Sequence, residues 1–158
     1  MKRIAGVMLG ALVVIAACGG GGSSALSKDE FVKQGNAICQ KGNDAIDSTG
    51  SSFFSDSTQQ PDPATVQKFF KETVSPNVKK QVDDLDKLNP PKELQAQVDK
   101  LVADARAALT KLQEQIDKDP NAALNSNEDP FANVNKEASA IGLVACASSD
   151  SQSSSSST

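Results

Sequence analysis

Residues 94–116, LQAQVDKLVADARAALTKLQEQI, carry the most regular hydrophobic repeat of the chain. The apolar side chains recur in steps of three and four residues, at Leu94, Val98, Leu101, Ala105, Leu109, Leu112 and Ile116. This spacing places them on one stripe of an α-helix, as in the helices of a bundle. The segment therefore predicts a long amphipathic helix that packs its stripe against other helices.

A second amphipathic helix is predicted directly before this one. Its apolar residues between Val66 and Leu88 are spaced almost wholly by threes and fours, Asp62-Pro63 marks its start, and Asn89-Pro90-Pro91 ends it. Pro76 lies inside it, lacks a backbone N–H and clashes with the preceding turn. We therefore expect a kink, or two shorter helices, near residues 73–75.

The first helix is predicted to begin at a capping box, Ser27-Lys28-Asp29-Glu30, in which Ser27 and Glu30 each accept from the other residue's amide. The helix is expected to end at about Asp47, and the turn-forming residues 48–62 are expected to form a loop. Its inner face is expected to combine apolar residues with glycines that let another backbone approach: Phe31, Gly35, Ile38, Gly42 and Ile46.

Asp129-Pro130 is predicted to open a last, short helix, and Gly142 suits the left-handed position that ends one. Its inward residues are expected to be Phe131, Val134, Ala138 and Ile141. No segment shows sustained period-two alternation, so the predicted fold class is all-α, an antiparallel four-helix bundle over residues 27–147 with a proline-kinked second helix. The serine-rich residues 148–158 are expected to form a disordered tail.

Residues 1–17 have the features of a secretory leader, because Lys2 and Arg3 precede an apolar run that is too short for a permanent membrane span. Ile15-Ala16-Ala17-Cys18 resembles the bacterial lipobox. Cys18 is therefore predicted to be lipidated after cleavage, which anchors the chain to membrane lipid on the extracytoplasmic side, with residues 18–26 as a flexible tether. The alternative is an ordinary signal peptide followed by a stray cysteine.

Assigning Cys18 to lipid leaves Cys39 and Cys146 as an even pair in an oxidising compartment, where a disulfide is the simplest interpretation. The bond would close about 106 intervening residues, for which the loop-entropy model gives about 4.7 kcal/mol. The rival interpretation is a pair of free or metal-binding thiols, although two sulfurs without histidine make a poor zinc site.

Composition narrows the possible functions. The chain has no histidine, which removes the commonest general base and the usual transition-metal ligand. Without the leader, 14 basic residues face 20 acidic ones, and this net charge of −6 argues against nucleic acid as a partner. Asp83, Asp84 and Asp86 are a candidate cation site, but a helix does not bring their carboxylates together, so we expect a solvated helix face. The sequence thus predicts no catalytic residue, metal or cofactor.

Several short stretches, spread from end to end of the predicted domain, form a recognisable pattern: Ser27-Lys28-Asp29-Glu30-Phe31, Ala37-Ile38-Cys39, Val74, Pro76, the segment from Leu85 to Pro91, and Ile141-Gly142-Leu143 before Cys146. In this pattern the chain resembles small secreted lipoproteins of actinobacteria and their relatives. Ile141 and Ala147 depart from the group's usual aromatic residue and glycine. The resemblance implies the helical fold and the bond between Cys39 and Cys146, not an activity.

Three functions are considered. The first is a non-catalytic interaction module of the cell envelope that engages a protein or polymer through charged helical faces. The second is a carrier or sensor that holds an apolar small molecule in a core cavity lined by Phe69, Phe70, Val98 and Leu101. The third, a hydrolase, is disfavoured without histidine and would need two convergent carboxylates with raised pKa values.

Overall fold

The computed structural model describes residues 24–53, 62–120 and 129–147. Across these residues every regular element is helical and no strand occurs, which confirms the all-α class. The predicted leader, Cys18 and the tether as far as residue 23, together with the predicted tail, lie outside the described residues. The elements are α1 (Lys28–Phe53), α2 (Pro63–Phe69), the π-helical turn η1 (Phe70–Val74), α3 (Ser75–Asp86), α4 (Lys92–Lys118) and α6 (Ala132–Ala140).

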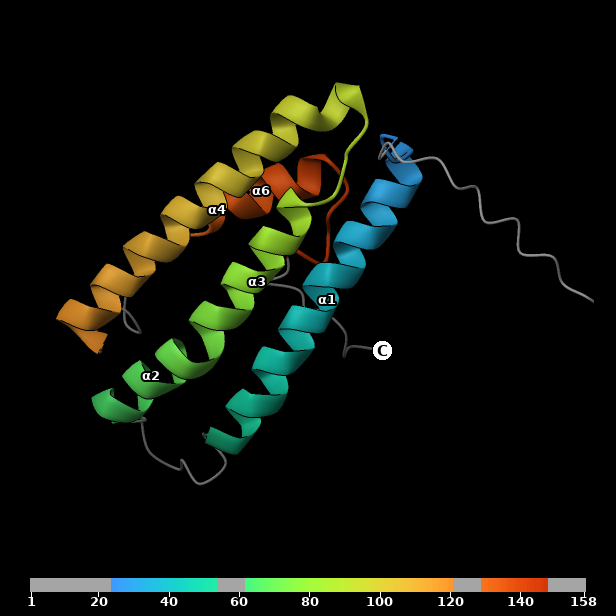
Figure 1. Cartoon of the computed structure of the whole chain (residues 1–158). Helices are drawn as coiled ribbons and strands as arrows, with labels where there is room; N and C mark the ends of the chain where they lie inside the picture. The colour runs from blue at the N-terminus through green and yellow to red at the C-terminus, as the bar shows by residue number, and fades with distance from the viewer. Residues whose placement is uncertain (1–23, 54–61, 121–128, 148–158) are drawn as a thin grey trace, which may run out of the picture.

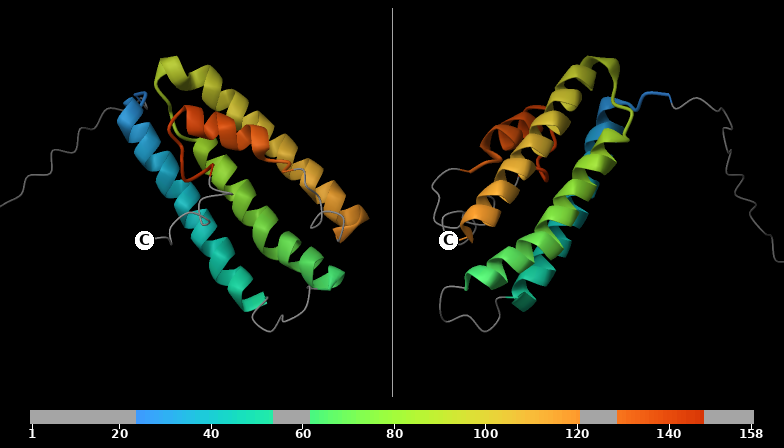
Figure 2. Two further views of the ribbon diagram at one scale, coloured as in Figure 1. Left: turned by 180° about the vertical axis from the view of Figure 1, so that it is seen from behind. Right: turned by 60° about the vertical axis from the view of Figure 1, so that its left-hand side comes forward.

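Three long helical segments lie side by side, and α3 packs against both α1 and α4 (Figure 1). The colours of Figure 1 show that the chain runs in opposite directions along α1 and α3, and again along α3 and α4. The short helix α6 packs on α4, and the view from behind shows it together with the segment that follows it (Figure 2). The segment 141–147 then returns the chain to α1.

The start of α1 is the predicted capping box. The Ser27 hydroxyl accepts from the Glu30 amide at 3.3 Å, and the Glu30 carboxylate accepts from the Ser27 amide at 3.2 Å. The hydrogen bonds from Ser27 hold the pKa of Glu30 below its usual value. Because both groups are local in sequence, this helix start is set without help from the rest of the fold.

The expected end of α1 is wrong, because the helix continues past Asp47 to Phe53. Hydroxyl side chains in this extension donate back to carbonyls one turn earlier, as from Thr49 to Ala45 at 2.9 Å and from Ser51 to Asp47 at 2.9 Å. The Phe53 ring also packs on Phe69, with centroids 5.3 Å apart. The loop predicted for residues 48–62 is therefore helical over 48–53, while 54–61 lie outside the described residues.

The second predicted helix remains helical through the proline. Asp62 caps α2 by accepting from the amides of Ala64 at 3.1 Å and Thr65 at 3.0 Å, as its place before Pro63 predicts. The turn η1 widens to a π-helix directly before α3, and the Ser75 amide donates to the Phe70 carbonyl. Pro76 has no backbone N–H, so it cannot donate the i to i−4 hydrogen bond of a regular α-helix. A π-helical turn is one way in which a helix accommodates that missing bond. The bend expected here stays a prediction.

The last helix ends as its glycine predicts. Gly142 has φ +91°, and the amides of Gly142 and Leu143 donate back to Ser139 at 3.1 Å and to Ala138 at 2.8 Å. These two bonds are the Schellman pattern, which needs a left-handed residue at this position. They reverse the chain and send the Leu143 side chain, which is fully buried, into the core.

The buried face of α1 differs from the expected stripe. Ile38 and Ile46 are only half-buried, whereas Cys39 is buried together with Phe31 and both glycines. The groups that pack against Gly35 and Gly42 are side chains, whereas we expected another stretch of backbone there. A Cβ built on Gly35 would lie 2.5 Å from Leu143 Cδ2, and one on Gly42 would lie 2.1 Å from Gln81 Nε2.

The close contact at Gly35 yields a stability test. Gly35→Ala gains helix propensity of about 1 kcal/mol but forces its methyl into the fully buried Leu143, at a cost of about 1–3 kcal/mol. Gly50→Ala is the matched control on the same helix, because its nearest neighbour is the half-buried Phe69 at 3.3 Å. Urea unfolding should rank Gly35→Ala below wild type and Gly50→Ala near or above it. Equal stability of the two variants would show that Leu143 can move.

Candidate functional site

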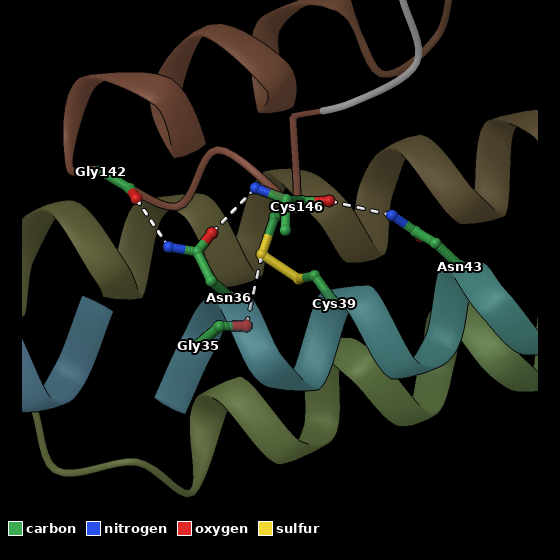
Figure 3. The surroundings of a disulfide bond; sticks show 7 residues. Gly35, Asn36, Cys39, Asn43, Gly142 and Cys146 are labelled. Carbon is green, nitrogen blue, oxygen red and sulfur yellow. Dashed lines mark hydrogen bonds between the residues drawn. A yellow bond between two sulfur atoms is a disulfide. The ribbon is translucent and has the colours of Figure 1, made fainter. Parts of the chain in front are cut away.

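The segment after α6 is fastened to α1 by side chains of α1 (Figure 3). Asn36 makes two hydrogen bonds, donating from Nδ2 to the Gly142 carbonyl at 2.9 Å and accepting at Oδ1 from the Ala145 amide at 2.8 Å. Two turns along, Asn43 Nδ2 donates to the Ala145 carbonyl at 2.9 Å. These side-chain amides form hydrogen bonds with backbone N–H and C=O groups that would otherwise lack partners in a half-buried loop.

The predicted cysteine pair forms the covalent part of this attachment. Cys39 and Cys146 are joined by a disulfide with their Cα atoms 5.0 Å apart, and Cys146 Sγ lies 3.8 Å from the Gly35 carbonyl oxygen. Cys39 is 2% exposed, so the bond is anchored within the core. The structure thus joins the first described helix to the segment after the last one.

Sequence reasoning missed the two asparagines. Asn36, Cys39 and Asn43 are spaced i, i+3 and i+7, which puts all three on one face of α1. The side-chain amides of Asn36 and Asn43 flank Cys39 at helical spacing, so they add polar groups to a part of α1 that we expected to be apolar. That pattern was the available signal that a backbone segment, and not another helix, covers this face.

A cavity of about 170 Å³ lies beside the disulfide and is partly open to solvent. Both cysteines line it, together with residues of α1, α3, α4 and α6. Its apolar wall consists of Val78, Val82, Leu85, Leu101, Val102, Ala105, Phe131 and Val134. A concave, mostly apolar space with a few polar groups is the usual form of a small-molecule site.

The polar groups of the cavity wall are all uncharged. They are the side-chain amides of Asn43, Gln81 and Asn135, and no charged side chain of the described residues lines the space. Asn43 Nδ2 is engaged by the Ala145 carbonyl, and Asn135 Nδ2 donates to Asp129 at 3.2 Å. The described lining of the site therefore offers apolar contacts and neutral hydrogen-bonding groups.

The cavity only partly matches the lining expected for a carrier. Leu101 lines it, whereas Phe69, Phe70 and Val98 are not among its lining residues. Phe70 and Val98 are buried elsewhere, and Phe69 packs on Phe53. The cavity lies nearer the disulfide than the sequence suggested, and Cys146 of the segment 141–147 lines it.

The charged side chains pair with one another across the helix surfaces. Arg106 of α4 donates to Asp86 at 2.8 Å and to Asp83 at 3.2 Å, and so bridges to α3. Lys79, and secondarily Arg106, hold the pKa of Asp83 below its usual value. Asp84 is paired with Lys80 and Lys87. The three aspartates considered for a cation are thus each bound by a basic side chain, as on a solvated helix face.

A second charged group links α4 to α6. Lys100 pairs with Asp104 and with Glu137, and these two carboxylates, Asp104 first, raise the pKa of Lys100 to about 12. In the part of the chain that the structure describes, no cluster of three or more histidine, cysteine or acidic side chains is arranged to hold a metal. Nor does any described helix combine the length and apolar character that crossing a bilayer requires.

Comparisons with known proteins identify no relative. No family model matches the chain, and the curated proteins and the solved structures give no match either.

The disulfide should contribute a large share of the domain's stability. The double variant Cys39→Ala with Cys146→Ala should lose about 2–5 kcal/mol of unfolding free energy, because the unfolded chain is no longer cross-linked over a long loop. Urea unfolding of the mature chain, with and without a thiol reductant, measures this. Wild type in reductant should unfold like the double variant, and the reductant should leave the double variant unchanged. An equally stable double variant would contradict the role assigned to the bond.

Proposed function

We propose that this chain is a lipid-anchored, extracytoplasmic, non-catalytic binding protein of the cell envelope that holds a small apolar molecule in its core. The observation that carries the proposal is the cavity of about 170 Å³ with an apolar wall and uncharged polar groups. An apolar cavity of about 150 Å³ is large enough to hold benzene, so a molecule of one-ring size fits.

The proposed organisation follows the sequence. Residues 1–17 are the signal peptide, Cys18 carries the lipid, and residues 18–26 tether a helical domain formed by 27–147, ahead of the tail 148–158. The domain is an antiparallel four-helix bundle whose second helix kinks at Pro76. An apolar ligand concentrates in the bilayer, and lipid anchoring keeps the cavity close to that reservoir.

Engagement of an envelope protein or polymer through charged helical faces, the first expectation from the sequence, has less support. Lys79, Lys80 and Arg106 already pair with acidic side chains of their own or the neighbouring helix. Exposed ion pairs of this kind are worth little individually, but they leave less unbalanced charge to attract a partner. The cavity is the more specific feature.

The anchor can be tested on the native host's protein. The mature form should begin at Cys18, carry added lipid mass there, and lack two hydrogens through the sulfur pair. Cys18→Ser should release the chain into the medium or periplasm. Replacing Cys39 and Cys146 with alanine should leave the chain on membranes, which is the matched cysteine control. Intact-mass measurement and membrane fractionation decide this, and a chain that starts at Met1 or a membrane-bound Cys18→Ser variant would refute the anchor.

The cavity can be tested with toluene as a probe on the unlipidated mature chain that carries Cys18→Ser. Toluene should bind saturably and shift the amide NMR signals of Val102 and Val134, which line the cavity. Ala105→Met places a larger side chain in the space and should weaken binding about tenfold or more. Ala107→Met, exposed on the same helix, is the control and should bind as wild type does. A wild-type chain without saturable shifts would refute the proposed function.

A further inference from the structure

Gln81 is the polar group that most distinguishes the cavity from a plain apolar void. Its side chain reaches from α3 to α1 and lies directly on Gly42, since a Cβ on that glycine would sit 2.1 Å from Nε2 and 2.3 Å from Cδ. No other residue type at position 42 leaves this space. The glycine therefore leaves room for the Gln81 carboxamide at the cavity wall, at the cost of helix propensity.

Among the residues that the structure describes, none makes a hydrogen bond with the Gln81 carboxamide, whereas the Nδ2 groups of Asn43 and Asn135 donate to neighbours of their own. A carboxamide has two donors and an accepting oxygen. The Gln81 side chain can thus offer a ligand either kind of hydrogen bond without breaking one inside the protein.

We propose that the cavity takes a neutral molecule with an apolar body of about one ring and a single hydrogen-bonding group, hydroxyl or carbonyl, which pairs with the carboxamide of Gln81. This inference rests on the proposed function and adds the ligand's chemical class to it. The apolar body occupies the space between Val102, Ala105 and Val134. The polar end meets the Gln81 carboxamide, whose donors and acceptor are not used in hydrogen bonds with the residues that the structure describes.

The wall also excludes charged ligands. Among the described residues that line the cavity there is no lysine, arginine, aspartate or glutamate to neutralise a carboxylate or an ammonium group. Moving an ion out of water without a counter-charge costs far more than apolar contact returns. A neutral hydroxyl or carbonyl costs much less, and one hydrogen bond to Gln81 recovers most of it.

The test uses three probes of one size on the same unlipidated mature chain: toluene, p-cresol and p-toluate. Wild type should bind toluene and p-cresol and should not bind the anion p-toluate at neutral pH. Gln81→Met keeps the side-chain length but removes the amide, so it should weaken p-cresol about tenfold and change toluene less than about twofold. Gln97→Met, exposed on α4 and away from the cavity, should change neither affinity.

Gly42→Ala provides an independent route to the same result. Its methyl must displace the flexible end of Gln81, so p-cresol should weaken while toluene does not, with Gln81 still present. NMR titration of the Val102 and Val134 amides reports all affinities and shows that each variant is folded. Equal weakening of toluene and p-cresol by Gln81→Met, or binding of p-toluate as tight as p-cresol, would overturn the ligand class while leaving the cavity proposal standing. Failure of wild type to bind toluene would overturn the proposed function itself.

Discussion

The attachment of residues 141–147 to α1 is the constraint on which the rest of the candidate site depends. The disulfide from Cys39 to Cys146 and the hydrogen bonds of Asn36 and Asn43 hold this irregular segment on a face of α1. In a simple helical bundle, the apolar face of another helix would cover that position. α6 has only nine residues and would be unstable alone. The Schellman turn at its end reverses the chain toward α1, and Leu143, directly after the turn, is fully buried. Both cysteines are among the residues that line the cavity, so the disulfide lies beside the binding space.

The glycines of α1 show what this arrangement requires from the sequence. A glycine inside a helix costs about 1 kcal/mol relative to alanine, and α1 accepts that cost at both Gly35 and Gly42. In return, Leu143 packs against the helix backbone at the first position and the Gln81 carboxamide does so at the second. The two contacts differ in purpose. The first completes an apolar core built mostly from aliphatic side chains, and the second brings a polar group to the edge of an apolar cavity.

The features that sequence reasoning predicted correctly are those decided by neighbours in the chain. The box at Ser27 and Glu30, the cap at Asp62 and the left-handed Gly142 each depend on a few adjacent residues. The end of α1 was missed because it depends on hydroxyl groups bonding back along the helix and on the distant contact of Phe53 with Phe69. The cavity lining was largely missed because a cavity is the space that packing leaves. Leu101 borders it, but Phe70 and Val98 fill other parts of the interior.

A carboxamide beside an apolar cavity also bears on selectivity. A purely apolar space discriminates weakly between similar molecules, because each added or missing methylene changes affinity by only about 1–3 kcal/mol. A wall that includes one hydrogen-bonding group penalises a ligand that leaves it unpaired, and it rejects an ion that it cannot neutralise. In the proposed carrier, Gln81 would therefore decide which membrane-soluble molecules are held, while the aliphatic wall would determine how tightly. Since a glycine at position 42 leaves the space that this amide occupies, selectivity would depend on a residue of α1 that carries no side chain of its own.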